Sequence, residues 1–176
     1  MTEKFADLHV HTTASDSSFT PAQAVGTAKR AGLSAIAIAD HDTVKGVPEA
    51  AAEGEVAGLE IIPAVEMTAY EGETEIHMLG YFVDWKQEIF AEKMEYFRKQ
   101  RYLRAAEIVK KLNLFGVNIG MEDVLKISGE NNSIGRMHIG LAILKAGYVK
   151  DMREAFNKYL GFGCVAYIKK EDLSSK

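Results

Sequence analysis

The sequence of 176 residues has a single cysteine, Cys164, and only three prolines. One cysteine excludes a framework of intrachain disulfides. No apolar run approaches the length needed to cross a bilayer, and residues 1–7 lack the apolar segment of a secretory signal. These absences predict a cytoplasmic protein that has no membrane as a partner.

The charge is unevenly distributed, although 47% hydrophobic and 26% charged residues are ordinary for a globular protein. Residues 1–85 carry 4 basic and 14 acidic side chains, and residues 86–176 carry 17 basic and 11 acidic ones, so their net charges are −10 and +6. Two interpretations stay open: a solvated basic helix beside an acidic domain, or a carboxylate-rich metal site faced by a phosphate-binding cap. The sequence pI of about 5.8 argues against a non-specific nucleic-acid binder.

In the first half, expected strands alternate with expected helices. The strands are expected at 5–11, 34–39, 60–65 and 74–82, and the helices at 21–31 and 48–57. Thr20 is a good N-cap, Pro21 suits the first helical position, and Gln23 completes a capping box. Strands separated by helices of about ten residues predict βαβ units and a parallel sheet, so the fold class is α/β.

The pattern changes at residue 86, where a stretch without glycine or proline predicts a helix over 86–113. Its apolar stripe comprises Met94, Phe97, Ala105, Ile108 and Leu112, and it follows a helical period if Arg101 is counted in the row. Shorter helices are expected at 121–127, 134–145 and 152–159, and a strand at 164–168. We therefore expect a barrel part at 1–85, an all-helical insertion at 86–163, and the start of a return to the sheet at 164–176.

Potential metal ligands follow the expected strands one after another. His9 and His11 are two residues apart on the first strand, so both imidazoles point to one face. Further ionisable residues lie in the next loop, after the second and third strands, and on the fourth: Asp16, His41, Glu66 and His77. Parallel α/β folds place their active sites at the ends of strands. The sequence therefore predicts one shared metal site, and mixed imidazole and carboxylate ligands suit two or three ions of zinc, manganese or iron.

Competing chemistries have weaker support. No G-x-S-x-G motif is present, so Ser15, Ser17 and Ser18 are interpreted as loop or capping residues. No P-loop or dinucleotide fingerprint follows a strand. An amidohydrolase would also begin with His-x-His, but such enzymes often use a lysine of the fourth strand to bridge metals, and residues 74–82 contain no lysine.

Two motifs resemble the PHP (polymerase and histidinol phosphatase) family. They are Asp7-Leu-His-Val-His-Thr-Thr-Ala-Ser-Asp16 and Ala39-Asp-His-Asp-Thr43. The stretches 133–140 and 154–161 are similar to nucleotide-directed members, the 3',5'-nucleoside bisphosphate phosphatases and RNA 5'-end exonucleases. One departure is Met137, where that subgroup is expected to have proline.

The resemblance implies the N-terminal part of a distorted (β/α)7 barrel with an inserted all-helical subdomain. It also implies three ion sites, each one ligand short: one held by His9, His11 and Glu66, one by Glu66 and His77, and one by Asp16 and His41. Later family motifs are absent, so a missing C-terminal segment or another chain would complete the barrel.

The implied activity is that of a metal-dependent phosphoesterase, in which Asp16, His41 and Glu66 serve catalysis and a metal-bound hydroxide attacks nucleotide or RNA phosphate. Arg136 and His138 lie at an expected helix start, where backbone N–H groups favour anions, and they are candidate phosphate ligands together with Arg101. The alternatives are a surface arginine, a packed histidine and a snorkelling arginine. A truncated, non-catalytic PHP remnant or interaction module is the alternative for the whole chain.

Overall fold

The computed structural model describes residues 4–72, 74–129 and 132–169. These residues form two compact units, one ending at Arg98 and one beginning at Lys99. The boundary falls inside α3 (Glu88–Leu114), whereas the sequence placed it after residue 85. Among the described residues, none of the helices combines the length and the apolar character needed to span a bilayer.

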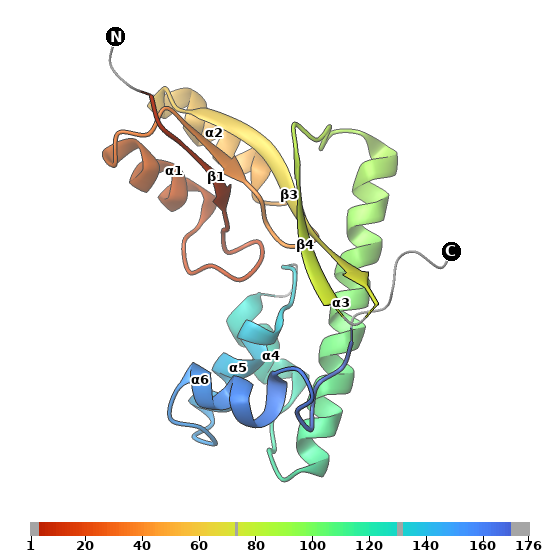
Figure 1. Ribbon diagram of the computed structural model, residues 1–176. Coiled ribbons are helices and arrows are strands. Elements are labelled where there is room, and N and C mark those ends of the chain that lie inside the picture. Colours follow the sequence, from red (N-terminus) through yellow and green to blue (C-terminus); the bar gives the residue numbers. More distant parts are fainter. Residues whose placement is uncertain (1–3, 73, 130–131, 170–176) are drawn as a thin grey trace. The chain divides into compact units, whose positions relative to one another are not determined.

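The first unit contains a four-stranded sheet in the order β1-β2-β3-β4, whose strands are β1 (Ala6–Val10), β2 (Ala35–Ile38), β3 (Glu60–Glu71) and β4 (Thr74–Tyr81) (Figure 1). The first three strands are parallel, as predicted, but β4 runs antiparallel to β3. Only residues 72 and 73 separate β3 from β4, and a parallel connection needs a crossover of about a dozen residues or more. Gly72 has a positive φ of 58° in this turn. The prediction that the fourth strand is parallel is therefore wrong, and β3 and β4 form a hairpin.

Helices α1 (Pro21–Arg30) and α2 (Val47–Ala57) connect the parallel strands. The capping box of α1 is confirmed: Thr20 Oγ1 accepts from the Gln23 N–H at 3.2 Å, and Gln23 Oε1 accepts from the Thr20 N–H at 3.0 Å. Strand β2 is buried on both faces. Ile36 and Ile38 pack in the cluster that includes residues of α1 and α2, and the alanines of β2 join a second cluster with Ala64.

The second unit is helical over the part of the chain that the structure describes. It contains the end of α3, then α4 (Met121–Ser128), α5 (Arg136–Lys145), α6 (Met152–Ala155) and a π-helix, η1 (Phe156–Leu160). Ala105, Ile108 and Leu112 of the predicted stripe lie in its core, whereas Met94 is buried in the core of the first unit.

Two local expectations fail in the second unit. The helix expected at 152–159 changes to a π-helix, which is closed by the Gly161 N–H donating to Phe156 O at 2.8 Å. Residues 164–168 form a bend, a turn at 165–166 and irregular chain instead of a strand. Their N–H groups are used locally, since Ala166 N donates to Tyr159 O at 3.1 Å and Tyr167 N donates to Cys164 O at 3.0 Å.

Candidate metal centre

Backbone pairing brings the residues after β2 alongside the middle of β3. The Asp42 N–H donates to Glu66 O at 2.9 Å, and the Glu66 N–H donates to Asp40 O at 3.2 Å. His41 thereby pairs with Glu66 in a parallel bridge. Glu66 was expected at the end of a strand, but β3 continues for five residues beyond it into the hairpin. The Glu66 side chain therefore starts from a fixed and buried position.

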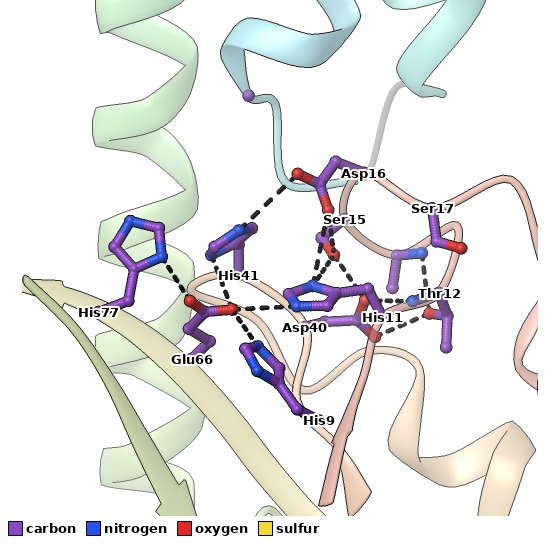
Figure 2. Close-up of polar contacts among 12 residues, drawn as sticks. His9, His11, Thr12, Ser15, Asp16, Ser17, Asp40, His41, Glu66 and His77 are labelled. Atoms are coloured by element: carbon purple, nitrogen blue, oxygen red, sulfur yellow. Dashed lines mark hydrogen bonds and ion pairs between the residues drawn. The ribbon is translucent and has the colours of Figure 1, made fainter. Parts of the chain in front are cut away.

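The Glu66 carboxylate contacts imidazoles from three other segments (Figure 2). Its Oε2 lies 2.8 Å from His9 Nε2 and 3.0 Å from His11 Nε2. The same oxygen lies 3.5 Å from His41 Nδ1, and Oε1 contacts His77 Nδ1. Only 2% of the Glu66 side chain is exposed, so one buried carboxylate gathers four histidines.

Asp16 approaches the same histidines from the loop after β1. Its Oδ1 lies 3.5 Å from His11 Nδ1, and its Oδ2 lies 3.7 Å from His41 Nε2. The six side chains divide into three overlapping groups: His9–His11–Glu66, His11–Asp16–His41 and His41–Glu66–His77. Within each group, one ligand atom per residue lies within 4.8 Å of the others. The structure thus brings together all six residues predicted as metal ligands.

Electrostatics keep Glu66 in the form that binds cations. Burial by itself raises the pKa of the Glu66 carboxyl, but the hydrogen bond with His9 and the charges of His41 and His77 outweigh burial and hold that pKa below its ordinary value. An ionised carboxylate surrounded by imidazole nitrogens is a donor set that suits zinc, manganese or iron. The residues present therefore fit divalent ions.

Two side chains at the centre were not singled out from the sequence. Glu75 Oε1 lies 3.1 Å from His77 Nε2. Its position two residues before His77 on the same strand places both on one face, and this spacing was the available signal. Ser15, interpreted as a loop or capping residue, is 1% exposed, and its Oγ lies 3.4 Å from His11 Nδ1.

Asp40 also lies at the centre, but its carboxylate points away from Glu66, toward the loop after β1 (Figure 2). It is fully buried and accepts hydrogen bonds from the Thr12 N–H at 2.7 Å, the Thr12 hydroxyl at 2.7 Å and the Ser15 hydroxyl at 2.6 Å. Burial raises the pKa of Asp40, and the hydrogen bonds from Ser15 and Thr12 oppose that rise.

Residues 7–162 match the family model described as PHP domain. The chain belongs to the PHP domain family. The mixed α/β fold, with parallel and antiparallel strands in one sheet, is consistent with part of a PHP barrel.

Relatives with named functions match most of this chain. A 5'-3' exoribonuclease from Haemophilus influenzae is 33% identical over 172 residues, which are 97% of this chain and 61% of the relative. A 3',5'-nucleoside bisphosphate phosphatase from Chromobacterium violaceum is 29% identical, over 92% of this chain and 57% of the relative. A crystal structure from Bifidobacterium adolescentis, described as a metal-dependent phosphoesterase, has a TM-score of 0.88 and 33% identity, over 96% of this chain and 59% of that chain. This PHP chain thus spans about three fifths of the length of these relatives.

The three predicted phosphate ligands belong to the second unit of the PHP chain. Arg101 Nη1 donates to Ile134 O at 3.4 Å, just before α5. Arg136 is the first residue of α5, and its guanidinium lies 5.7 Å from the centre of the Tyr167 ring. His138 is 5% exposed, and its Nδ1 accepts from the Gly135 N–H at 2.9 Å. The structure thus gathers Arg101, Arg136 and His138 around the start of one helix.

Proposed function

We propose that this chain is the metal-binding part of a phosphoesterase that hydrolyses phosphate esters of nucleotides or RNA 5' ends. The observation that carries this proposal is the overlap of the three ligand groups, because Glu66 and His41 each belong to two of them. Shared ligands bring two ions close to one another, which suits a reaction in which an attacking and a leaving oxygen are both stabilised.

Two or three divalent ions of manganese, zinc or iron are the proposed cofactors. When bound, such ions supply Lewis-acid polarisation of the phosphoryl group and a water of lowered pKa. His9, His11 and Glu66 would hold one ion, Glu66 and His77 with His41 would hold a second, and Asp16 with His41 would hold a third. Glu66, Asp16 and His41 are then the proposed catalytic residues, because Glu66 and His41 each belong to two ligand groups and Asp16 Oδ2 lies 3.7 Å from His41 Nε2.

The proposed substrate class follows from the relatives and from the start of α5. The relatives are named for a 5'-3' exoribonuclease and a nucleoside bisphosphate phosphatase. Arg136 offers a planar pair of donors for a phosphate, and it stands beside the first-turn N–H groups of a ten-residue helix. Arg101 and His138 are proposed to bind phosphate with it.

Each proposed ion has two or three protein ligands, which leaves room for further ones. We propose that the ligands still missing come from a chain segment beyond the matched part of the relatives or from a second chain, and that the helical unit is an insertion into the barrel. The support is the length of the relatives, of which the matched region is 57–61%.

Phosphate release from adenosine 3',5'-bisphosphate by the 176-residue chain tests the activity, with manganese, zinc or no added metal. Release that needs metal and is lost in Glu66→Gln supports the proposal. Glu60→Gln is the matched control, because Glu60 begins the same strand and is exposed. Arg136→Ala is expected to raise KM more than it lowers kcat, whereas Arg153→Ala, exposed on α6, leaves both unchanged.

The alternative is a PHP module that binds metal without catalysis, and the three-ligand groups favour it for the chain by itself. It predicts metal binding by wild type, loss of binding in Glu66→Gln, and no phosphate release with any ion. Adding the remaining two fifths of a relative as a separate polypeptide distinguishes the two. Recovered release means an enzyme that lacks a segment, and no release means a non-catalytic module.

A further inference from the structure

The segment between His11 and Asp16 is anchored by a carboxylate from another strand end. Asp40 is 28 residues from Thr12 and 25 from Ser15 in sequence, yet it accepts hydrogen bonds from both. Thr12, Ser15 and Asp40 are 0%, 1% and 0% exposed. A buried polar cluster of this kind persists only when its donors and acceptors are paired, so these contacts fix the loop that carries two candidate metal ligands.

The hydrogen-bond directions in this cluster are determined by counting protons. The Thr12 N–H can only donate, and it lies 2.7 Å from Asp40 Oδ1, so this oxygen is an acceptor. Ser15 Oγ is 2.6 Å from the same oxygen, so the single hydroxyl proton of Ser15 points to Asp40. Asp16 Oδ1 is a poorer acceptor for that proton because it lies 3.5 Å from Ser15 Oγ.

The direction of the Ser15 hydroxyl affects which ring nitrogen of His11 carries a proton. Because the Ser15 proton is used by Asp40, Ser15 Oγ presents only lone pairs to His11 Nδ1, 3.4 Å away. Asp16 Oδ1, 3.5 Å from the same nitrogen, also accepts only. Both neighbours therefore favour a proton on His11 Nδ1. Glu66 Oε2, 3.0 Å from Nε2, also attracts a proton, but a divalent ion bound at Nε2 would displace that proton. In the loaded site, the single proton of a neutral His11 would therefore lie on Nδ1, where Ser15 and Asp16 accept it.

We propose that Asp40 and Ser15 are positioning residues that hold the His11 proton on Nδ1 and present His11 Nε2 as a metal ligand beside His9 and Glu66. This inference rests on the proposed metal centre. It also resolves an ambiguity, since His11 belongs to two of the candidate groups. With Nδ1 protonated, His11 binds in the group with His9 and Glu66, and it does not supply Nδ1 to the group with Asp16 and His41.

The first test is Zn²⁺ binding, measured by calorimetric titration of the wild-type chain and of Ser15→Ala. Loss of a group that orients a metal-binding histidine typically lowers metal affinity about 10- to 100-fold, and we expect a loss in that range. Ser17→Ala is the matched control, because Ser17 lies in the same loop and its hydroxyl accepts only from the Phe19 N–H, at 3.3 Å. Circular dichroism establishes that each variant is folded.

Asp40→Asn separates hydrogen bonding from charge. The Thr12 N–H forces the amide oxygen of an asparagine to face it, so the acceptor for Ser15 is kept while the negative charge is lost. We expect a loss of Zn²⁺ affinity below about tenfold, smaller than in Ser15→Ala. A loss in Asp40→Asn as large as in Ser15→Ala overturns the argument from proton directions.

The second test needs no variant. Long-range ¹H–¹⁵N correlation spectra of the Zn²⁺-loaded wild type are expected to show His11 protonated on Nδ1. A proton on Nε2, or equal Zn²⁺ affinities of wild type and Ser15→Ala, overturns the positioning role and leaves the metal centre standing. A wild-type chain that binds neither Zn²⁺ nor Mn²⁺ overturns both.

Discussion

A methyl group at residue 46 is expected to disturb the hydrogen bonds by which Asp40 fixes the loop of residues 12–15. A Cβ built on Gly46 would lie 2.7 Å from both Asp40 Oδ2 and Thr12 Oγ1, whereas ordinary contacts begin at 3.4 Å. Both atoms would have to move by 3.4 − 2.7 = 0.7 Å, although they are buried and hydrogen-bonded to each other. Overpacking of this kind costs about 1–3 kcal/mol. The backbone at Gly46, with φ −74° and ψ −21°, suits alanine. Alanine lowers the conformational entropy of the unfolded chain, and this effect stabilises the folded state by about 0.4–1 kcal/mol.

The net expectation for Gly46→Ala is a loss of about 1.3 kcal/mol in the free energy of unfolding, from middle values of about 2 and about 0.7, and urea titration measures it. Gly26→Ala is the control. Gly26 lies inside α1, and its added Cβ would meet only Arg30 Nη1, at 3.3 Å, which is the end of a flexible side chain. Alanine favours a helix over glycine by about 1 kcal/mol, so this variant is expected to be more stable than wild type. Changes of opposite sign in the free energy of unfolding of Gly46→Ala and Gly26→Ala support the predicted clash at residue 46. A Gly46→Ala protein as stable as wild type refutes it.

Further expectations concern caps and core. Thr20→Ala removes the capping box of α1 and should cost about 1 kcal/mol in urea unfolding. Leu112→Ala, fully buried in the second unit, should cost about 2–5 kcal/mol, whereas Leu114→Ala, 77% exposed, should stay within about 0.5 kcal/mol. The Gly120 N–H donates to the Asp123 carboxylate and lowers the pKa of this carboxyl in the folded state. The ionised carboxylate therefore stabilises the folded state at a pH above the unfolded pKa of about 3.9. This stabilisation is lost as the pH falls through the lower pKa of the folded state. The stability difference between wild type and Asp123→Asn should therefore shrink on acidification, as thermal unfolding across pH would show.

Local sequence signals predicted the helices and the parallel strands well, because caps and apolar periods are properties of neighbouring residues. Thr20, Pro21 and Gln23 are an example, since all their partners lie within three residues. The β3–β4 hairpin was missed because its turn is short and β3 continues beyond its apolar run into residues 66–71. The buried Thr68 in that extension shows that polar residues there still face packed surroundings.

The positions of the predicted metal ligands followed from strand ends, and the family resemblance implied that Glu66 serves two ions, but the contact of Glu66 with all four histidines did not follow from either. Glu66 gathers four histidines because parallel pairing with β2 ends beside it while pairing with β4 has already begun, at Ala64↔Tyr81. The register of β1 also shifts by one residue between Asp7 and Val10, around His9. Such register features depend on neighbouring strands, so a single strand's sequence does not display them.

The segment Asp40-His41-Asp42 contains one predicted metal ligand, His41, beside two carboxylates. In the structure, the Asp40 oxygens accept an N–H and two O–H groups, so their lone pairs are already used by hydrogen-bond donors. The Glu66 oxygens instead face imidazole nitrogens, each of which becomes a metal ligand once its proton leaves. The groups around each buried carboxylate, more than its burial, therefore favour Glu66 as the candidate metal ligand and Asp40 as the anchor of the loop that contains Thr12 and Ser15.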